Sequence, residues 1–198
     1  MNDGILNLMD VCRSGSRALG PGLRYVIWTQ GCPFHCKGCI SSESRPVVKR
    51  NVVDVDLMAE DITCRTQIEG ITISGGEPMM QAPSLTRLLK LVKAQRPELT
   101  VIIFTGYKIE ALKSQTHQAL LALTDVLIDG LFELDRVSHR GLRGSENQRI
   151  HFLNDKLLAH QEELEHGERR LETLVTDGAL VTIGIPNDEQ LRTLQKPY

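Results

Sequence analysis

The stretch "GITISGGEPMMQAPSLTRLLKLVKAQRPELTVIIFTGY", residues 70–107, decides the fold. Its first residues, 70–74, form a short apolar run typical of a strand. Residues 83–95 begin with a proline and carry Leu or Val at 85, 88, 89 and 92, the spacing of one helix face. Residues 99–105 are an unbroken apolar run, as in strands buried on both faces. The stretch therefore predicts a strand–helix–strand unit with parallel strands.

The same alternation continues on both sides of this unit. Further strands are predicted at 23–29 and 125–130, and further helices at 54–65 and 109–124. The order β-α-β-α-β-α-β implies a parallel sheet with right-handed crossovers. After Gly130 the pattern changes to a polar loop, a predicted helix at 150–166, and a hairpin around Asp177 and Gly178.

We therefore expect an α/β fold whose parallel core strands form an open partial (β/α) barrel. A closed eight-stranded barrel typically takes about 250 residues, and this chain has 198. Residues 1–130 are predicted to form the core. Residues 131–198, a small helix plus the β-hairpin, are predicted to be an extension packed on that core within one structural domain.

Composition narrows the class of protein. The formal net charge is −2, so we expect no binding to nucleic acid or to a membrane surface. The N-terminus has acids where a signal peptide has basic residues, and no apolar run approaches the ~18 residues of a membrane span. These features predict a cytoplasmic protein, and five cysteines in a reducing compartment indicate ligands more than disulfides.

Each predicted core strand runs into an unusual motif. The strand at 23–29 leads into the cysteine loop, and the strand at 70–74 leads into Gly75-Gly76-Glu77-Pro78. The next two strands lead into Thr105-Gly106-Tyr107 and Asp129-Gly130. Because the carboxyl ends of parallel strands meet at one face, where ligands bind, the four motifs are expected to converge on one site.

The cysteine loop, "GCPFHCKGCI" at 31–40, spaces its thiols as Cys32-x3-Cys36-x2-Cys39. Zinc sites with four protein ligands usually add a second Cys or His pair, and none is visible here. A cubane iron–sulfur cluster takes four ligands, so three cysteines would leave one iron open to a further ligand. A structural zinc site or a redox thiol group remains the alternative.

These residues resemble the radical S-adenosylmethionine (SAM) enzymes, which share the Cys-x3-Cys-x2-Cys loop and the Gly-Gly-Glu motif. The similarity narrows to the activating enzymes of glycyl-radical enzymes, and within them to the activating-protein family of anaerobic ribonucleoside-triphosphate reductase. It spans about residues 7–150 and rests on 20–39, 73–81, 104–107, 127–130 and 143–150. In this family SAM supplies the missing ligand of a 4Fe-4S cluster, and residues 1–130 would be the radical SAM core.

The resemblance assigns roles residue by residue. Cys32, Cys36 and Cys39 would ligate the cluster and carry the catalysis. Gly38, just before the third cysteine, matches a glycine of these activators and counts among the cofactor-binding positions. The remaining cofactor-binding positions are the methionine-binding segment Gly75, Gly76 and Glu77, and the ribose or sulfonium contacts Thr105, Tyr107 and Asp129. A side chain at Gly76 would be expected to enter the space of the bound methionine moiety.

The implied activity is reductive cleavage of SAM at the cluster to a 5′-deoxyadenosyl radical. That radical would install a glycyl radical on a large partner, an anaerobic ribonucleotide reductase or another glycyl-radical enzyme, with a flavodoxin-like reductant. The basic residues around the cysteine loop are a candidate docking surface: Arg24, Lys37, Arg45, Lys49 and Arg50. One alternative is a radical SAM enzyme that modifies a small molecule or a peptide. The other is a non-catalytic iron–sulfur or zinc protein, which leaves Gly75-Gly76-Glu77 unexplained.

Two cysteines lie outside the loop. Cys64 falls late in the predicted helix at 54–65 and is expected to be a buried structural thiol. Cys12 falls in what reads as a polar loop before the first strand and is expected to be incidental.

Overall fold

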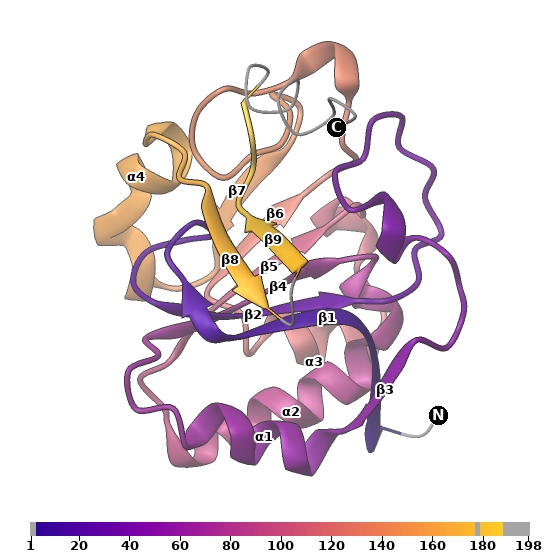
Figure 1. The fold of residues 1–198 in the computed structure, drawn as a ribbon, viewed down its shortest axis with the longest axis vertical. Coiled ribbons are helices and arrows are strands. Elements are labelled where there is room, and N and C mark those ends of the chain that lie inside the picture. Colours follow the sequence, from indigo (N-terminus) through magenta and orange to yellow (C-terminus); the bar gives the residue numbers. More distant parts are fainter. Residues whose placement is uncertain (1–2, 177–178, 188–198) are drawn as a thin grey trace.

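The protein is described by a computed structural model covering residues 3–176 and 179–187. Its centre is a seven-stranded sheet in the order β3-β1-β2-β4-β5-β6-β7 (Figure 1). The strands are β1 Ile5–Ser16, β2 Arg24–Thr29, β3 Asn51–Asp54, β4 Gly70–Gly75, β5 Thr100–Thr105, β6 Val126–Asp129 and β7 Arg149–Phe152.

The parallel core is the part that the sequence predicted. Strands β2, β4, β5 and β6 pair in parallel in that order. One row of side chains crosses all four, because Ile27 pairs with Ile73, Ile73 with Ile103, and Ile103 with Leu127. All four are fully buried, as expected for strands covered on both faces.

Three helices pack against one face of the sheet: α1 Val55–Thr63, α2 Ala82–Gln95 and α3 Gln115–Leu121. The predicted apolar stripe of α2 at 85, 88, 89 and 92 is fully buried. Asp54 caps α1 by accepting hydrogen bonds from the Asp56 and Leu57 N–H groups. The helix predicted at 109–124 is a 3-10 turn, Ile109–Ala111, followed by α3, because Ser114 caps a new helix between them.

The sheet does not close into a barrel in the described part of the chain, since it ends in the antiparallel edge strands β3 and β7. The sequence prediction missed β1, β3 and β7. It was also wrong about the start of the helix at 150–166. Residues 149–152 pair with β6, and only the 3-10 segment Asp155–His160 and the short α4 Gln161–His166 are helical.

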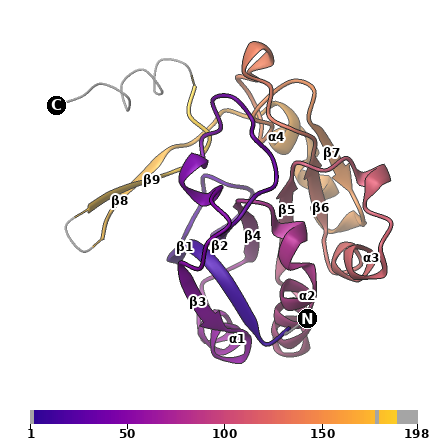
Figure 2. The same ribbon diagram turned by 90° about the vertical axis from the view of Figure 1, so that its right-hand side faces the viewer.

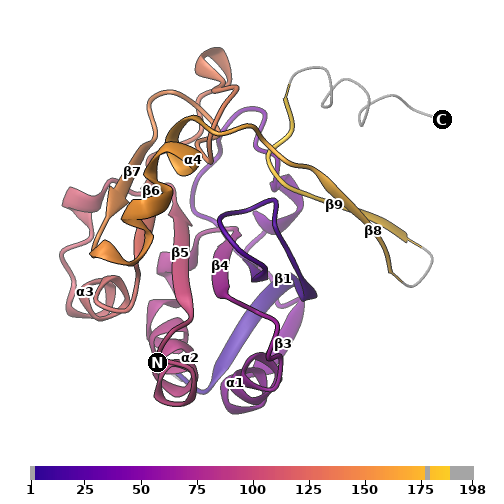
Figure 3. The same cartoon turned by 90° about the vertical axis from the view of Figure 1, so that its left-hand side faces the viewer.

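The predicted C-terminal hairpin is present as β8 Glu172–Thr176 and β9 Ala179–Ile183, while its central Asp177 and Gly178 lie outside the described residues. It lies on the other side of the sheet from the three helices (Figures 2 and 3). There Ile183 is buried in a cluster with Cys12, Ala18, Leu19 and Val26.

The polar loop predicted around Cys12 and the burial predicted for Cys64 were both wrong. Cys12 lies in β1, where the hairpin covers it, and is only 6% exposed. Cys64 is exposed, because it caps the C-terminus of α1 beyond the buried face of that helix.

Arg24 is fully buried at the start of β2, so it is not part of a docking surface. Its guanidinium donates to the hydroxyls of Thr72 and Thr100 and to three backbone carbonyls, those of Pro21, Ile71 and Thr100. This residue therefore ties β2, β4 and β5 together at the end of the sheet away from the cysteine loop. In the described part of the chain no helix is long and apolar enough to cross a bilayer.

Candidate cluster and cofactor site

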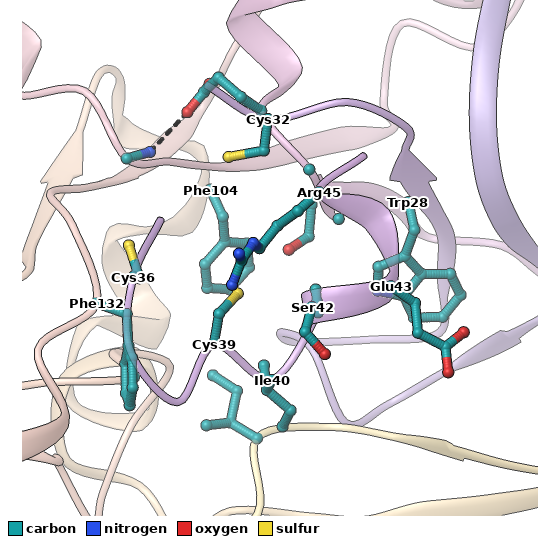
Figure 4. A pocket seen from close by; sticks show the side chains of 18 of the residues that line it. Trp28, Cys32, Cys36, Cys39, Ile40, Ser42, Glu43, Arg45, Phe104 and Phe132 are labelled. Atoms are coloured by element: carbon teal, nitrogen blue, oxygen red, sulfur yellow. Dashed lines mark hydrogen bonds between the residues drawn. The ribbon is translucent and has the colours of Figure 1, made fainter. Parts of the chain in front are cut away.

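A cavity of about 390 Å³ lies at the carboxyl ends of the parallel strands (Figure 4). The structure brings together there most of the residues that the sequence singled out. Those that line it are Cys32, Cys36, Gly38, Cys39, Gly75, Gly76, Glu77 and Thr105. Gly106 and Gly130 line it as well. Each of the four strand-end motifs therefore contributes to the cavity, as predicted.

The cysteine loop is held by backbone hydrogen bonds to the segment that follows it. Gly31 N donates to Ser44 O at 2.7 Å, and Cys32 N donates to Arg45 O at 3.0 Å. Gly38 has φ +74°, a left-handed conformation that lets the chain turn between the second and third cysteines. The three loop thiols are free and half-buried, so a group in the cavity can reach them.

The donor set fits a multi-iron cluster better than a single metal ion. In residues 3–176 and 179–187, no three Cys, His, Asp or Glu side chains come close enough together to hold one ion. The three thiols instead surround one cavity (Figure 4). That spread suits a cubane cluster, in which each cysteine binds a different iron.

Burial raises the pKa of the Cys32 and Cys39 thiols, and hydrogen bonds with the backbone of Phe34 and Ser41 oppose that shift. The Arg45 guanidinium also opposes the rise in the pKa of Cys39, and its side chain extends toward that sulfur in Figure 4. Arg45 thus places a positive charge beside the thiols, which suits an anionic cluster.

Gly75 and Gly76 are required by the protein's own backbone. Gly75 has φ +98°, and an added Cβ would lie 2.7 Å from Thr29 O. A Cβ on Gly76 would overlap the Gly31 carbonyl and lie 2.9 Å from Ser44 O. A side chain at Gly76 would therefore meet the protein's own backbone at Gly31 and Ser44, which is a reason for glycine in addition to the predicted space for the ligand.

Glu77 is fully buried, and its carboxylate is occupied by protein donors. Oε1 accepts from Met79 N at 2.9 Å and Thr105 Oγ1 at 2.8 Å, and Oε2 accepts from Gly106 N at 2.8 Å. Burial raises its pKa to about 7, and these three donors oppose the rise. Glu77 therefore joins the segments that follow β4 and β5.

Tyr107 and Asp129 are not among the residues that line the cavity. Tyr107 packs edge-on against Phe34 of the cysteine loop, with ring centroids 4.8 Å apart. Asp129 is buried and accepts from Ile109 N at 2.7 Å and from Arg149 Nη2 at 2.5 Å. Burial opposes ionisation, but these donors outweigh it and lower the pKa of Asp129.

Sequence reasoning missed several lining residues. Four of these missed residues lie on the strands or on the loops that follow them: Trp28, Phe104, Phe132 and Gln148. Gln148 positions this edge of the cavity, since its amide donates to Gly130 O and accepts from Gly144 N. Phe104 could have been found from its place at the end of a buried strand. The hairpin residues Val181, Thr182, Gly184, Ile185 and Pro186 carry no sequence signal that points to the site.

The sequence was compared with known proteins. The profile of a family described as "4Fe-4S single cluster domain" matches residues 18–151. An anaerobic ribonucleoside-triphosphate reductase-activating protein of Enterobacteria phage T4 is 30% identical over 145 residues, 71% of this chain and 91% of that protein. Proteins of the same name match at 32% identity in Haemophilus influenzae (67% of this chain, 89% of the relative) and 29% in Escherichia coli K12 (68% and 91%). The chain therefore belongs to the 4Fe-4S single cluster domain family, among the anaerobic ribonucleoside-triphosphate reductase-activating proteins.

Proposed function

We propose that this chain is a radical SAM activating enzyme that installs a glycyl radical on an anaerobic ribonucleotide reductase. Its cofactors are a 4Fe-4S cluster and SAM. The names of the relatives support this function, and so does the convergence of three thiols and a glycine-rich segment on one cavity. That convergence is the observation that carries the proposal.

Cys32, Cys36 and Cys39 are the proposed cluster ligands, because they are the free thiols that line the cavity. SAM is proposed to bind alongside, against the backbone at Gly75 and Gly76. When bound, the cluster and SAM supply reductive cleavage of a carbon–sulfur bond and, from it, the radical that removes hydrogen from the partner's glycine.

The chain's own residues hold and shield this site. Glu77 fixes the glycine-rich segment against the Thr105–Gly106 turn, and Arg45 balances negative charge beside Cys39. Tyr107 and Asp129 are proposed to act behind the cavity wall, by supporting Phe34 and the segment at Ile109. Residues 1–130 would be the core, shaped as an open partial barrel whose open side receives a large substrate, with residues 131–198 packed on it.

The partner would bring its glycine to the open mouth of the cavity. Lys37, Lys49 and Arg50 are exposed beside the cysteine loop and remain candidate docking residues. The proposal includes a flavodoxin-like reductant, a cytoplasmic location, and no binding to nucleic acid or membranes.

The test is anaerobic reconstitution with iron and sulfide, followed by electron paramagnetic resonance (EPR) with SAM, a reductant and an anaerobic ribonucleotide reductase. We expect a glycyl-type doublet on the reductase, and cleavage of that protein at the same glycine on exposure to oxygen. A reductase whose glycine is replaced by alanine, and the Cys36→Ala activator, are the matched controls and should show no doublet.

Multiple turnovers of a small molecule, with no radical on any candidate reductase, would favour the small-molecule alternative. A cluster that forms but neither binds nor cleaves SAM would favour the non-catalytic one.

A further inference from the structure

Strand β9 of the C-terminal hairpin and residues 184–186, which follow it directly, contribute a wall to the cavity that the three cysteines line. Val181, Thr182, Gly184, Ile185 and Pro186 all line it. They lie well beyond residue 151, where the match to the family profile ends. This wall is therefore a feature of the chain's own C-terminal segment.

The hairpin is anchored at its base by polar contacts. The Glu172 carboxylate accepts hydrogen bonds from Arg17 N at 3.1 and 3.2 Å. Arg169 donates to Gly141 O at 3.1 Å and to Pro186 O at 3.4 Å, which joins the loop after β6 to the end of the hairpin. Gly184 has φ +128° and passes so close to Arg170 O that a Cβ would overlap it.

Apolar packing fixes the same segment against the sheet. Ile183 is 1% exposed in the cluster with Cys12 and Val26. Ile185 packs against two clusters, the one under the hairpin and the one that contains Ile102 and Ile128. A segment held by both polar and apolar contacts is a built part of the site and not a loosely attached tail.

The side that this wall presents to the cavity is mostly apolar. Val181, Ile185 and Pro186 line it together with Trp28 and Phe104. Apolar side chains exclude water from the space that they enclose, and radical chemistry requires water to be excluded. The arrangement therefore suits a cofactor that must be shielded before the partner docks.

We infer that the hairpin is an intrinsic wall of the SAM cavity, so that this chain shields one side of its cofactor without help from the partner. The inference rests on the proposed function. It makes Thr182 and Ile185 positioning residues for the cofactor.

The first test uses a cross-strand pair, because Thr173 and Thr182 are partners in the hairpin register. Thr182 lines the cavity, whereas Thr173 is exposed and does not. Thr182→Tyr would place a ring in the cavity and should weaken SAM binding to the reconstituted protein by about tenfold or more. Thr173→Tyr, with the same change on the neighbouring strand, should bind SAM like the wild type.

The second test measures how far the wall shields the cavity from solvent. Trp28 can report this, because it is the single tryptophan of the chain and lines the cavity. Ile185→Ser should open the wall and increase acrylamide quenching of Trp28 fluorescence in the full-length, cluster-free protein. Leu158→Ser, at a residue that is 43% exposed and does not line the cavity, should leave quenching unchanged. This readout is independent of SAM and of the cluster.

The two ideas fail in different ways. A reconstituted wild-type protein that does not bind SAM would overturn the proposed function. Wild-type SAM binding that Thr182→Tyr leaves unchanged, together with Trp28 quenching that Ile185→Ser leaves unchanged, would overturn the wall. Should Ile185→Ser unfold the chain, the Thr182 and Thr173 pair decides alone.

Discussion

Thr105 Oγ1 donates a hydrogen bond to Glu77 Oε1 at 2.8 Å, and both side chains are buried. The bond connects the segment after β4 to the end of β5, directly beside the cysteine loop. Gly106 N completes the contact on Oε2. The carboxylate of Glu77 in the glycine-rich motif therefore accepts its hydrogen bonds from the protein's own groups.

Glu77 should make stability depend on pH. Burial raises its folded pKa to about 7 from an ordinary 4.5, so the folded state holds the proton more tightly than the unfolded state. The contribution is therefore fully present below pH 4.5 and is lost as pH rises toward 7, by about 3 kcal/mol. Glutamine does not titrate, so Glu77→Gln lacks this pH-dependent contribution. The free energy of unfolding of the wild type, relative to that of Glu77→Gln, should therefore fall by about 3 kcal/mol between pH 4.5 and 8.

The measurement is urea unfolding of both cluster-free proteins at several pH values. Comparing the two proteins cancels carboxylates such as Asp61 and Asp129, whose lowered pKa values act with the opposite sign. A stability difference that stays constant across this range would mean that folding does not raise the pKa of Glu77.

The loop cysteines should act as one set. Cys32→Ala, Cys36→Ala or Cys39→Ala should each abolish the visible absorbance of the 4Fe-4S cluster and all SAM cleavage, because each removes an iron ligand. Cys64→Ala should change neither, since Cys64 is exposed at the end of α1. Cys12→Ala should keep the cluster and cost about 1 kcal/mol of stability from lost packing under the hairpin. Full cluster content in Cys36→Ala would contradict the ligand assignment.

Gly76→Ala should damage cluster assembly as well as SAM binding. Its Cβ would overlap the carbonyl of Gly31, next to Cys32, so the cysteine loop must shift. We expect iron and sulfide content well below wild type, and a stability loss of about 1–3 kcal/mol. If Gly76→Ala assembles a full cluster and loses only SAM binding, the contact with the loop is not what requires glycine.

Arg24→Lys should destabilise the fold and spare the site. Lysine has three donors where arginine uses its planar fork to bond five oxygens, so buried acceptors would be left unpaired. The expected loss is about 2–4 kcal/mol in urea unfolding, with normal cluster content per folded chain. Arg87→Lys on the surface, whose ion pair with Asp56 is 39% and 50% exposed, should cost less than about 1 kcal/mol. Equal losses of stability in the two variants would show that the buried hydrogen bonds of Arg24 stabilise the fold no more than a surface ion pair does.

Local pattern predicted the parallel core and most of the site. The buried strands 99–105 and 125–130 and the stripe of α2 are set by side chains a few residues apart, so periodicity alone was sufficient. The motifs at the strand ends were predictable for the same reason, since parallel strands bring their carboxyl ends to one face. Tyr107 and Asp129 stand at strand ends as predicted but do not line the cavity, because their side chains contact Phe34 and the segment at Ile109, and such contacts are not a local property of the sequence.

By itself, the sequence determined the alternating strands and helices, the cysteine spacing and the glycine-rich turn, because each depends on neighbours along the chain. Only the tertiary structure decided that β1, β3 and β7 complete the sheet, that Cys12 is buried and Cys64 exposed, and that Gly76 is required by the Gly31 carbonyl. It also decided that the hairpin segment lines one side of the cavity. These outcomes depend on contacts between segments far apart in sequence, such as Glu172 with Arg17, whose pairing only the folded chain brings about.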